Sequence, residues 1–285
     1  MRTEKQSRRQ FLWTVSTATA ASLAGVKGCL GQVQNPRAMT AVESRLKLGL
    51  ASYTLRKFGL DETLAMTARL GLKYICFKSF HLPLDSTPAQ IQDVVAKVKQ
   101  AGLILYGGGV ISMKKEADVH QAFDYAKAAG MKIIIGAPDP ELLLLINKKV
   151  QEYDIKVAIH NHGPTDKLYP IPASAYEKIK DLDRRIGLCN DIGHTMRAGV
   201  DPSVSVEKFA DRLLDVHIKD VSETTAKGQT VEIGRGVIDI PRFIRTLLKI
   251  NYKGVVSFEY EKDADDPFVG LAESVGYVRG VLAAV

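Results

Sequence analysis

The sequence has few cysteines, no long hydrophobic run and little net charge outside its first forty residues. Its three cysteines are Cys29, Cys76 and Cys189, and only the last two follow residue 40. Two cysteines define no disulfide framework. The apolar stretch from Trp13 to about Val26 is too short and too rich in Ala, Ser and Thr for a transmembrane helix of about 20 apolar residues. No membrane span is therefore predicted.

The formal net charge of +7 is concentrated at the N-terminus. Residues 1–40 contain six basic groups and one acidic group, which leaves 33 basic and 31 acidic groups in the rest of the chain. A domain this close to neutrality lacks the positive patch that nucleic acids and anionic membranes require. Nucleic acid is therefore not predicted as a partner.

The first forty residues are predicted to be an export signal and linker. Ser7-Arg8-Arg9-Gln10-Phe11-Leu12 precedes the apolar stretch and resembles a twin-arginine signal, which predicts a periplasmic or secreted protein. A disordered basic tail is the alternative interpretation. Cys29 has the position of a lipoprotein cysteine, but Lys27 stands where a small residue is expected, so lipidation is disfavoured.

Residues 41–285 are predicted to form one (β/α)8 TIM barrel. The chain has 285 residues, of which 46% are hydrophobic and 25% charged, so it can fill one large core, and disorder and coiled coil are excluded. Short β-rich runs alternate with eight amphipathic helical segments. The strands are expected to start near Leu46, Tyr74, Leu103, Lys132, Lys156, Ile186, Leu213 and Gly254.

A doubly wound sheet is the alternative fold. It is disfavoured because Leu50-Ala51-Ser52-Tyr53-Thr54 follows the first strand, where a dinucleotide-binding sheet carries a glycine-rich fingerprint. The run Gly107-Gly108-Gly109 is a weak phosphate-binding signal, and we interpret it as a flexible turn that lets the backbone approach a ligand.

The candidate metal-binding and catalytic residues lie at the ends of the last four strands. Active sites of such barrels lie at the carboxyl ends of the strands. Imidazoles and carboxylates from four neighbouring ends can converge on one divalent cation, and this mixed set of nitrogen and oxygen ligands suits Mn, Co, Fe or Zn. The residues at these ends are His160 and His162, Asp191 and His194, His217 and Lys219, and Glu259.

Each of these residues also has a structural interpretation. A lone histidine in a barrel strand is more often a hydrogen-bonded core residue. Asp191, His217 and Glu259 together are harder to explain in that way, because buried charges are costly unless they bind something. Lys78 and His81 form a polar pair just past the second strand, for which an ion pair in a loop is the alternative.

These residues resemble the xylose-isomerase-like TIM barrels, also called the sugar phosphate isomerase/epimerase superfamily, over residues 46–283. The resemblance implies divalent metal ligands from strands five to eight, and Asp191, His217 and Glu259 match three of them. His160 stands where epimerases of the family have Glu. The pattern His160-Asn161-His162 is similar to that of inosose dehydratases and of exported proteins that cleave 3-keto-glycosides. The motifs that carry the resemblance are Asp191-Ile192-Gly193-His194, Val216-His217-Ile218-Lys219-Asp220 and Ser257-Phe258-Glu259.

The resemblance implies an exported metal-dependent enzyme of the sugar isomerase/epimerase type, which removes a proton next to a carbonyl and passes through an enediolate. A lyase or dehydratase that acts by β-elimination is the alternative, and the loss of the strand-five carboxylate favours it over two-base epimerisation. We predict Glu259, His162, His194 and Lys219 as catalytic residues. Lys78, His81 and Arg197 are predicted to bind the sugar substrate, and His160, Asp191, His217 and Glu259 to bind one divalent metal ion.

Two other functions remain open at this stage. A non-catalytic sugar-binding protein on the same barrel is disfavoured by the complete ligand set. An abasic-site endonuclease shares the barrel, but the near-neutral charge and the export signal oppose it. No particular sugar, metal or oligomeric state is predicted.

Overall fold

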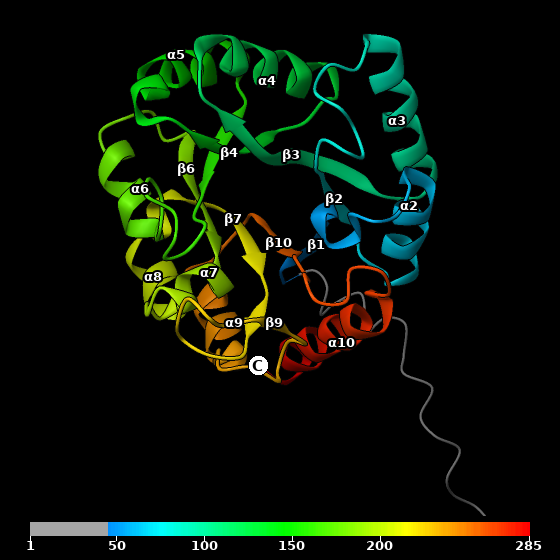
Figure 1. The fold of residues 1–285 in the computed structure, drawn as a ribbon, viewed down its shortest axis with the longest axis vertical. Coiled ribbons are helices and arrows are strands. Elements are labelled where there is room, and N and C mark those ends of the chain that lie inside the picture. The colour runs from blue at the N-terminus through cyan, green and yellow to red at the C-terminus, as the bar shows by residue number, and fades with distance from the viewer. Residues whose placement is uncertain (1–44) are drawn as a thin grey trace, which may run out of the picture. The chain divides into compact units, whose positions relative to one another are not determined.

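The computed structural model describes residues 45–285, so the predicted export signal and the possible lipidation site at Cys29 lie outside the described residues. Within this range, eight parallel strands close into a barrel in the order β1-β10-β7-β6-β5-β4-β3-β2, and the helices surround it (Figure 1). The predicted (β/α)8 barrel is therefore confirmed. The strands are β1 (Lys47–Ala51), β2 (Tyr74–Phe77), β3 (Ile104–Met113), β4 (Ile133–Pro138), β5 (Lys156–His160), β6 (Ile186–Asp191), β7 (Leu213–Ile218) and β10 (Val255–Phe258).

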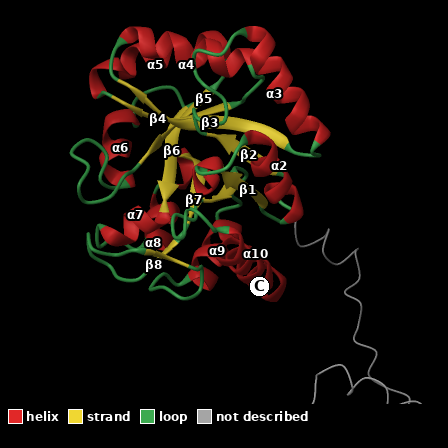
Figure 2. Ribbon diagram, turned by 45° about the vertical axis from the view of Figure 1, so that its right-hand side comes forward, coloured by secondary structure: helices red, strands yellow, loops and turns green. Residues whose placement is uncertain are grey.

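A helix follows every strand of the barrel, and two helices follow β6 (Figure 2). Their amphipathic sequences place one apolar stripe against the strands, as Ile240, Phe243, Ile244 and Leu247 do in α9. Within residues 45–285, no helix is long and apolar enough to cross a membrane. The helices are α2 (Leu60–Arg69), α3 (Pro88–Gln100), α4 (Glu116–Ala128), α5 (Leu143–Tyr153), α6 (Pro172–Ile179), α7 (Ile192–Arg197), α8 (Pro202–Lys208), α9 (Ile240–Lys249) and α10 (Phe268–Ala284).

The three glycines at positions 107 to 109 lie inside β3, so their interpretation as a flexible turn was wrong. A Cβ at Gly107 would lie 2.8 Å from Cγ2 of Ile133, and one at Gly109 would lie 2.2 Å from the carbonyl oxygen of Ile135. The glycines therefore let β3 approach the backbone of β4 closely. The close approach is to protein and not to a ligand.

The connection between β7 and α9 contains a small hairpin that the sequence pattern did not predict. Its strands, β8 (Asp220–Val221) and β9 (Thr230–Val231), pair antiparallel outside the barrel. The buried carboxylate of Asp220 accepts hydrogen bonds from the backbone N–H groups of Val221, Gly234, Gly236 and Ile238, at 2.9 to 3.2 Å. One side chain thus fixes both ends of this connection beside the mouth of the barrel.

Candidate metal centre

Four side chains with ligand atoms meet at the carboxyl ends of β5, β6, β7 and β10. His160, Asp191, His217 and Glu259 each offer one nitrogen or oxygen atom, and these atoms all lie within 4.8 Å of one another. Each of the four side chains is at most 8% exposed. The structure therefore brings together the four residues that the sequence predicted as metal ligands.

The distances within this cluster suit a single small cation. His160 Nε2 lies 3.2 Å from His217 Nδ1 and 3.4 Å from Asp191 Oδ2, and His217 Nδ1 lies 3.3 Å from Glu259 Oε2. In a tetrahedral site with bonds of about 2.1 Å, neighbouring ligand atoms are about 3.4 Å apart. Two imidazoles and two carboxylates are also a donor set that first-row divalent metals accept. The residues present thus fit one such ion.

Burial and charge put three of the four side chains in the form that binds metal. Burial lowers the pKa of His160 to about 3, so its imidazole is neutral and keeps a lone pair. Burial alone would raise the pKa values of Asp191 and Glu259, but Lys219 outweighs it and holds both well below their usual range. For His217, burial is outweighed by Glu259 and Asp215, which raise its pKa. A metal ion would take the place of that proton.

Lys219 places a buried ammonium group against the cluster. Its Nζ lies 2.9 Å from Asp191 Oδ2 and 2.7 Å from Glu259 Oε2, and it also pairs with Glu261. These carboxylates outweigh burial and raise the pKa of Lys219 well above its ordinary value. The lysine stem fits against α7 because residue 193 is glycine, where a Cβ would lie 2.4 Å from Lys219 Cγ. Lys219 is therefore a fixed cation beside the ligand carboxylates.

Asp215 supports the cluster from below and was missed in the sequence. It precedes His217 by two residues, so both side chains leave the same face of β7. Asp215 Oδ2 lies 3.6 Å from His217 Nε2. A carboxylate in this place favours a proton on Nε2 and directs Nδ1 into the cluster. The two-residue spacing from His217 was the signal that could have found it.

Cys189 is a less suitable ligand than the four clustered residues. Its sulfur lies close enough to His160 and His217 to form a second group of possible ligands. Burial and the nearby Asp215 raise the pKa of this thiol well above its ordinary value, so it stays protonated. The thiol donates a hydrogen bond of 3.3 Å to Asp215 Oδ2 and so helps to hold that carboxylate.

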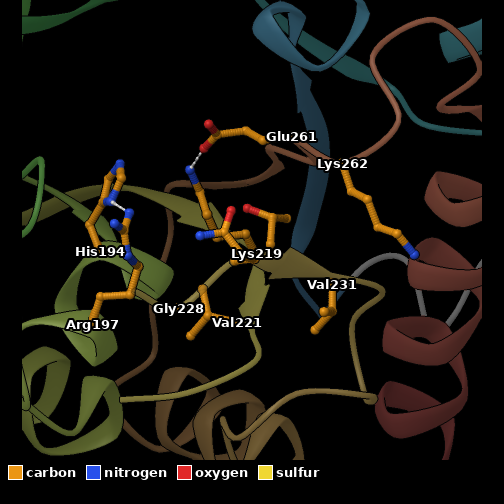
Figure 3. A pocket seen from close by; sticks show the side chains of 10 residues that line it. His194, Arg197, Lys219, Val221, Gly228, Val231, Glu261 and Lys262 are labelled. Atoms are coloured by element: carbon orange, nitrogen blue, oxygen red, sulfur yellow. Dashed lines mark hydrogen bonds and ion pairs between the residues drawn. The ribbon is translucent and has the colours of Figure 1, made fainter. Parts of the chain in front are cut away.

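Two cavities open beside the cluster and share Glu261. The cavity over the cluster has a volume of about 240 Å³, and the residues that line it are Tyr53, Lys78, Val110, His160, His162, Glu259 and Glu261. The neighbouring cavity has a volume of about 420 Å³ and is bounded by Lys219, by α7 and by the β8–β9 hairpin (Figure 3). Tyr53, Val110 and Glu261 were not predicted, because nothing in their spacing marks them.

The predicted catalytic histidines divide between these cavities. His162 lines the cavity over the cluster, with its Nδ1 3.4 Å from Asp166 Oδ2, and His194 lines the neighbouring cavity. Burial lowers the pKa of both imidazoles, which leaves them neutral and able to accept a proton. Their ring centroids are 6.1 Å apart. Two neutral bases and one fixed ammonium, Lys219, therefore surround the cluster.

The residues predicted to bind substrate lie in three different places. Lys78 lines the cavity over the cluster and donates a hydrogen bond of 2.6 Å to the carbonyl of Val110. Arg197 lines the neighbouring cavity. His81 is 5% exposed and lines neither cavity, because its Nε2 lies 3.0 Å from Thr63 Oγ1 and 3.1 Å from the carbonyl of Phe58. The side chain of His81 thus packs outside the cavity that Lys78 lines.

Comparison with known proteins agrees with the fold. A family model described as xylose isomerase-like TIM barrel matches residues 40–280. An inosose dehydratase of Clostridium tetani is 28% identical over 135 residues, which are 41% of this chain and 44% of that protein, so the match spans less than half of the relative. Solved structures of L-ribulose 3-epimerase and of the 3-keto-D-glucoside 4-epimerase YcjR of E. coli each have a TM-score of 0.67 at 17% identity, and cover 84% and 82% of this chain and 95% and 99% of their own.

Proposed function

This chain belongs to the xylose isomerase-like TIM barrel family, and we propose that it is a metal-dependent enzyme that removes a proton beside the carbonyl group of a sugar or keto-sugar. The proteins to which it is similar include sugar epimerases, isomerases and dehydratases. The observation that carries this proposal is the buried cluster of His160, Asp191, His217 and Glu259. Three pairs of its ligand atoms are 3.2 to 3.4 Å apart, and His160 and Glu259 line a cavity.

The residues around the cluster divide the work of the reaction. A divalent cation held by the four ligands would polarise the substrate carbonyl and stabilise the negative charge that develops on its oxygen. His162 is the base best placed to take the proton, because it is neutral and lines the same cavity. Lys219 is the proton donor in this proposal, because its ammonium lies beside Glu259 and a divalent cation on Asp191 and Glu259 would offset the carboxylates that raise its pKa.

This arrangement favours β-elimination. His162 removes the proton on the carbon next to the carbonyl, and the electron pair of that C–H bond forms a C=C bond. The C–O bond to the leaving group breaks at the β-carbon, and the leaving oxygen takes a proton from Lys219. Lys219 lines the neighbouring cavity, while its partners Glu259 and Glu261 line the cavity over the cluster, so the donor stands between the two.

Isomerisation or epimerisation is the second candidate, and one observation favours it. Glu259 and His162 both line the cavity over the cluster, so a proton removed by one group can be returned by the other. Against it, the fifth strand offers His160 Nε2 to the cluster in place of a second carboxylate. A ligating imidazole has no lone pair left for proton transfer.

The test begins with metal analysis of the purified protein, followed by incubation with ketoses and 3-keto-glycosides in deuterated water. We expect a bound divalent metal and a released aglycone with an unsaturated keto-sugar. Deuterium exchange between two intact ketoses, with no eliminated product, would favour the second candidate. His162→Gln should abolish turnover, whereas His120→Gln, on the exposed face of α4, should not. Absence of any turnover and of any metal would contradict both candidates.

We also propose that the enzyme is exported through its twin-arginine segment. The support is the sequence of residues 7–12 together with the charge of residues 1–40. Replacing Arg8 and Arg9 with Lys should leave the protein in the cytoplasm, measured by cell fractionation. Unchanged export of this variant would show that the segment is not a twin-arginine signal.

A further inference from the structure

We propose that the cavity beyond Lys219 is a second subsite, in which Arg197 binds a carboxylate carried by the leaving group of the substrate. The assignment of the occupant as a leaving group rests on the proposed function. The cavity has a volume of about 420 Å³ and adjoins the one over the metal ligands, with which it shares Glu261. It can therefore hold a separate part of one substrate molecule.

Arg197 is the basis of this proposal, because its charge has no acidic partner within residues 45–285. Its guanidinium donates hydrogen bonds to the carbonyl of Ala226 at 2.7 Å and to His194 Nδ1 at 3.4 Å. Neither acceptor is a carboxylate, and its Nε is buried without a hydrogen-bond partner. A guanidinium has five N–H donors in a planar fork that matches a carboxylate. Arg197 thus retains both charge and donors for a ligand.

The other cations of this cavity are already neutralised. Lys219 pairs with Asp191, Glu259 and Glu261. Lys262 pairs with Glu232 at 2.8 Å. Among the described residues that line this cavity, Arg197 is therefore the cation without a carboxylate partner. One unpaired guanidinium matches a singly charged carboxylate better than a doubly charged phosphate monoester.

The β8–β9 hairpin forms one wall of this cavity and is held in a defined conformation. Gln229, Thr230 and Val231 of the hairpin line the cavity. The four backbone hydrogen bonds to Asp220 hold the connection in place. Gly228 lies against the stem of Arg197, since a Cβ there would be 3.2 Å from Arg197 Cγ. The hairpin therefore both completes the cavity and positions the arginine.

The position of Lys219 defines which part of the substrate enters this cavity. The ammonium group lies at the boundary between the two cavities, in contact with Glu259 and Glu261, and Figure 3 shows Arg197 and His194 standing together on one side of the Lys219–Glu261 pair. A leaving oxygen protonated by Lys219 is thus released on the side of Arg197.

The test measures binding of two probes that differ in one group, the carboxylate of 4-hydroxybenzoate and the neutral hydroxymethyl group of 4-hydroxybenzyl alcohol, to the full-length metal-loaded protein by calorimetry. We expect the carboxylate probe to bind about tenfold to a hundredfold more tightly than the alcohol, because hydrogen bonds to a charged group are lost with the alcohol. Arg197→Gln should remove this difference by weakening only the carboxylate. Arg197→Lys should restore part of it, and His162→Gln, in the other cavity, should leave it unchanged.

Equal binding of the two probes by the wild type would overturn the proposal, and this result needs no variant to fold. A preference for the carboxylate that survives in Arg197→Gln but disappears in His162→Gln would also overturn it, because the probe would then lie over the metal ligands. Neither result depends on turnover. A failure of the proposed elimination reaction is seen separately, as the absence of product from 3-keto-glycosides.

Discussion

The two halves of the barrel share one backbone plan and differ in what their strand ends carry. The ends of strands β1 to β4 provide none of the four clustered ligands, and their last residues are Ala51, Phe77, Met113 and Pro138. Strands β5, β6, β7 and β10 end at or beside the four clustered ligands His160, Asp191, His217 and Glu259. The glycines of β3 let that half pack closely, while the other half accepts buried charges. The candidate metal ligands thus lie on one side of the barrel, while Tyr53, Lys78 and Val110 of the other side line the cavity above them.

Asp191→Asn, in the half of the barrel that holds the candidate metal ligands, is expected to have the largest effect on metal affinity and turnover. The Oδ1 atom of Asp191 also accepts a hydrogen bond from His194 N and caps α7, which asparagine can do as well. The substitution removes a ligand charge, so metal affinity and turnover should each fall about a thousandfold, since a bound metal contributes several kcal/mol. Metal titration and steady-state kinetics measure both.

Asp201→Asn is the matched control for that substitution. Asp201 caps α8 in the same way but belongs to no ligand group of the described residues. Metal affinity and turnover should stay within about twofold of the wild type. Equal losses in the two variants would mean that capping, and not ligation, explains the effect.

Gly109→Ala in β3, in the half of the barrel without metal ligands, should lower the free energy of unfolding and leave metal affinity unchanged. The new Cβ would lie 2.2 Å from a backbone oxygen of Ile135, which cannot move aside without shifting β4. We expect a loss of about 3 kcal/mol in the free energy of unfolding, measured by urea denaturation. At Gly136 the nearest atom is the flexible end of Met113, at 2.6 Å, so Gly136→Ala should cost only about 1 kcal/mol. Loss of metal affinity in a fully stable Gly109→Ala would remove the contrast between the halves.

Asp215→Asn tests whether the carboxylate beside His217 contributes to metal binding. Loss of the carboxylate beside His217 Nε2 should weaken metal binding about tenfold to a hundredfold, because that carboxylate orients the imidazole. Tyr252→Phe is the control, since the hydroxyl of Tyr252 is also buried but donates to the carbonyl of Val255 at 2.9 Å. A Tyr252→Phe variant that loses as much metal affinity as Asp215→Asn would argue against a specific role for Asp215.

The last contrast is the pH dependence of the two clustered histidines in the metal-free protein, which should differ in sign. The pKa of His160 is lowered to about 3 in the folded state, so stability is lost as pH falls from 6.5 towards 3, by up to about 1.4 kcal/mol per pH unit. The pKa of His217 is raised, so its contribution is present below pH 6.5 and is lost as pH rises through the raised value.

Denaturation of His160→Gln and His217→Gln across this pH range separates the two contributions. The first variant should lose less stability in acid than the wild type, and the second should lose less as pH rises above 6.5. Identical pH profiles in both variants would show that the two imidazoles share one protonation state in the folded chain.

Most of the fold was predictable from the short apolar runs of the sequence. All eight barrel strands begin within one residue of the predicted positions, because each is a short hydrophobic run flanked by polar residues. The β8–β9 hairpin was missed because strands of two residues leave no periodic pattern. The glycines of β3 were misread because the need for close approach to β4 depends on the neighbouring strand, which is remote in sequence.

The candidate site was predictable where polar residues interrupt a strand end. His160, Asp191, His217 and Glu259 stand out because buried strands rarely end in charges. The contribution of Asp215 depends on a contact with His217 Nε2, and that of Glu261 on the direction of a loop. His81 looked like a rim residue because it follows β2, but its ring turns towards Thr63 on α2. Side-chain direction after a strand is a tertiary property.

The tip of the hairpin anchored by Asp220 is structurally separate from the strands that hold the candidate metal ligands. Residues 222–227 at its tip are exposed, whereas the ligands and Lys219 lie on other parts of the barrel. Because one carboxylate ties down both ends of the connection, loops of other lengths can replace the tip without disturbing the strands beneath. The tip is thus an exchangeable loop, and tips grafted from related barrels would replace the carbonyl of Ala226, which accepts a hydrogen bond from Arg197 at the wall of the neighbouring cavity.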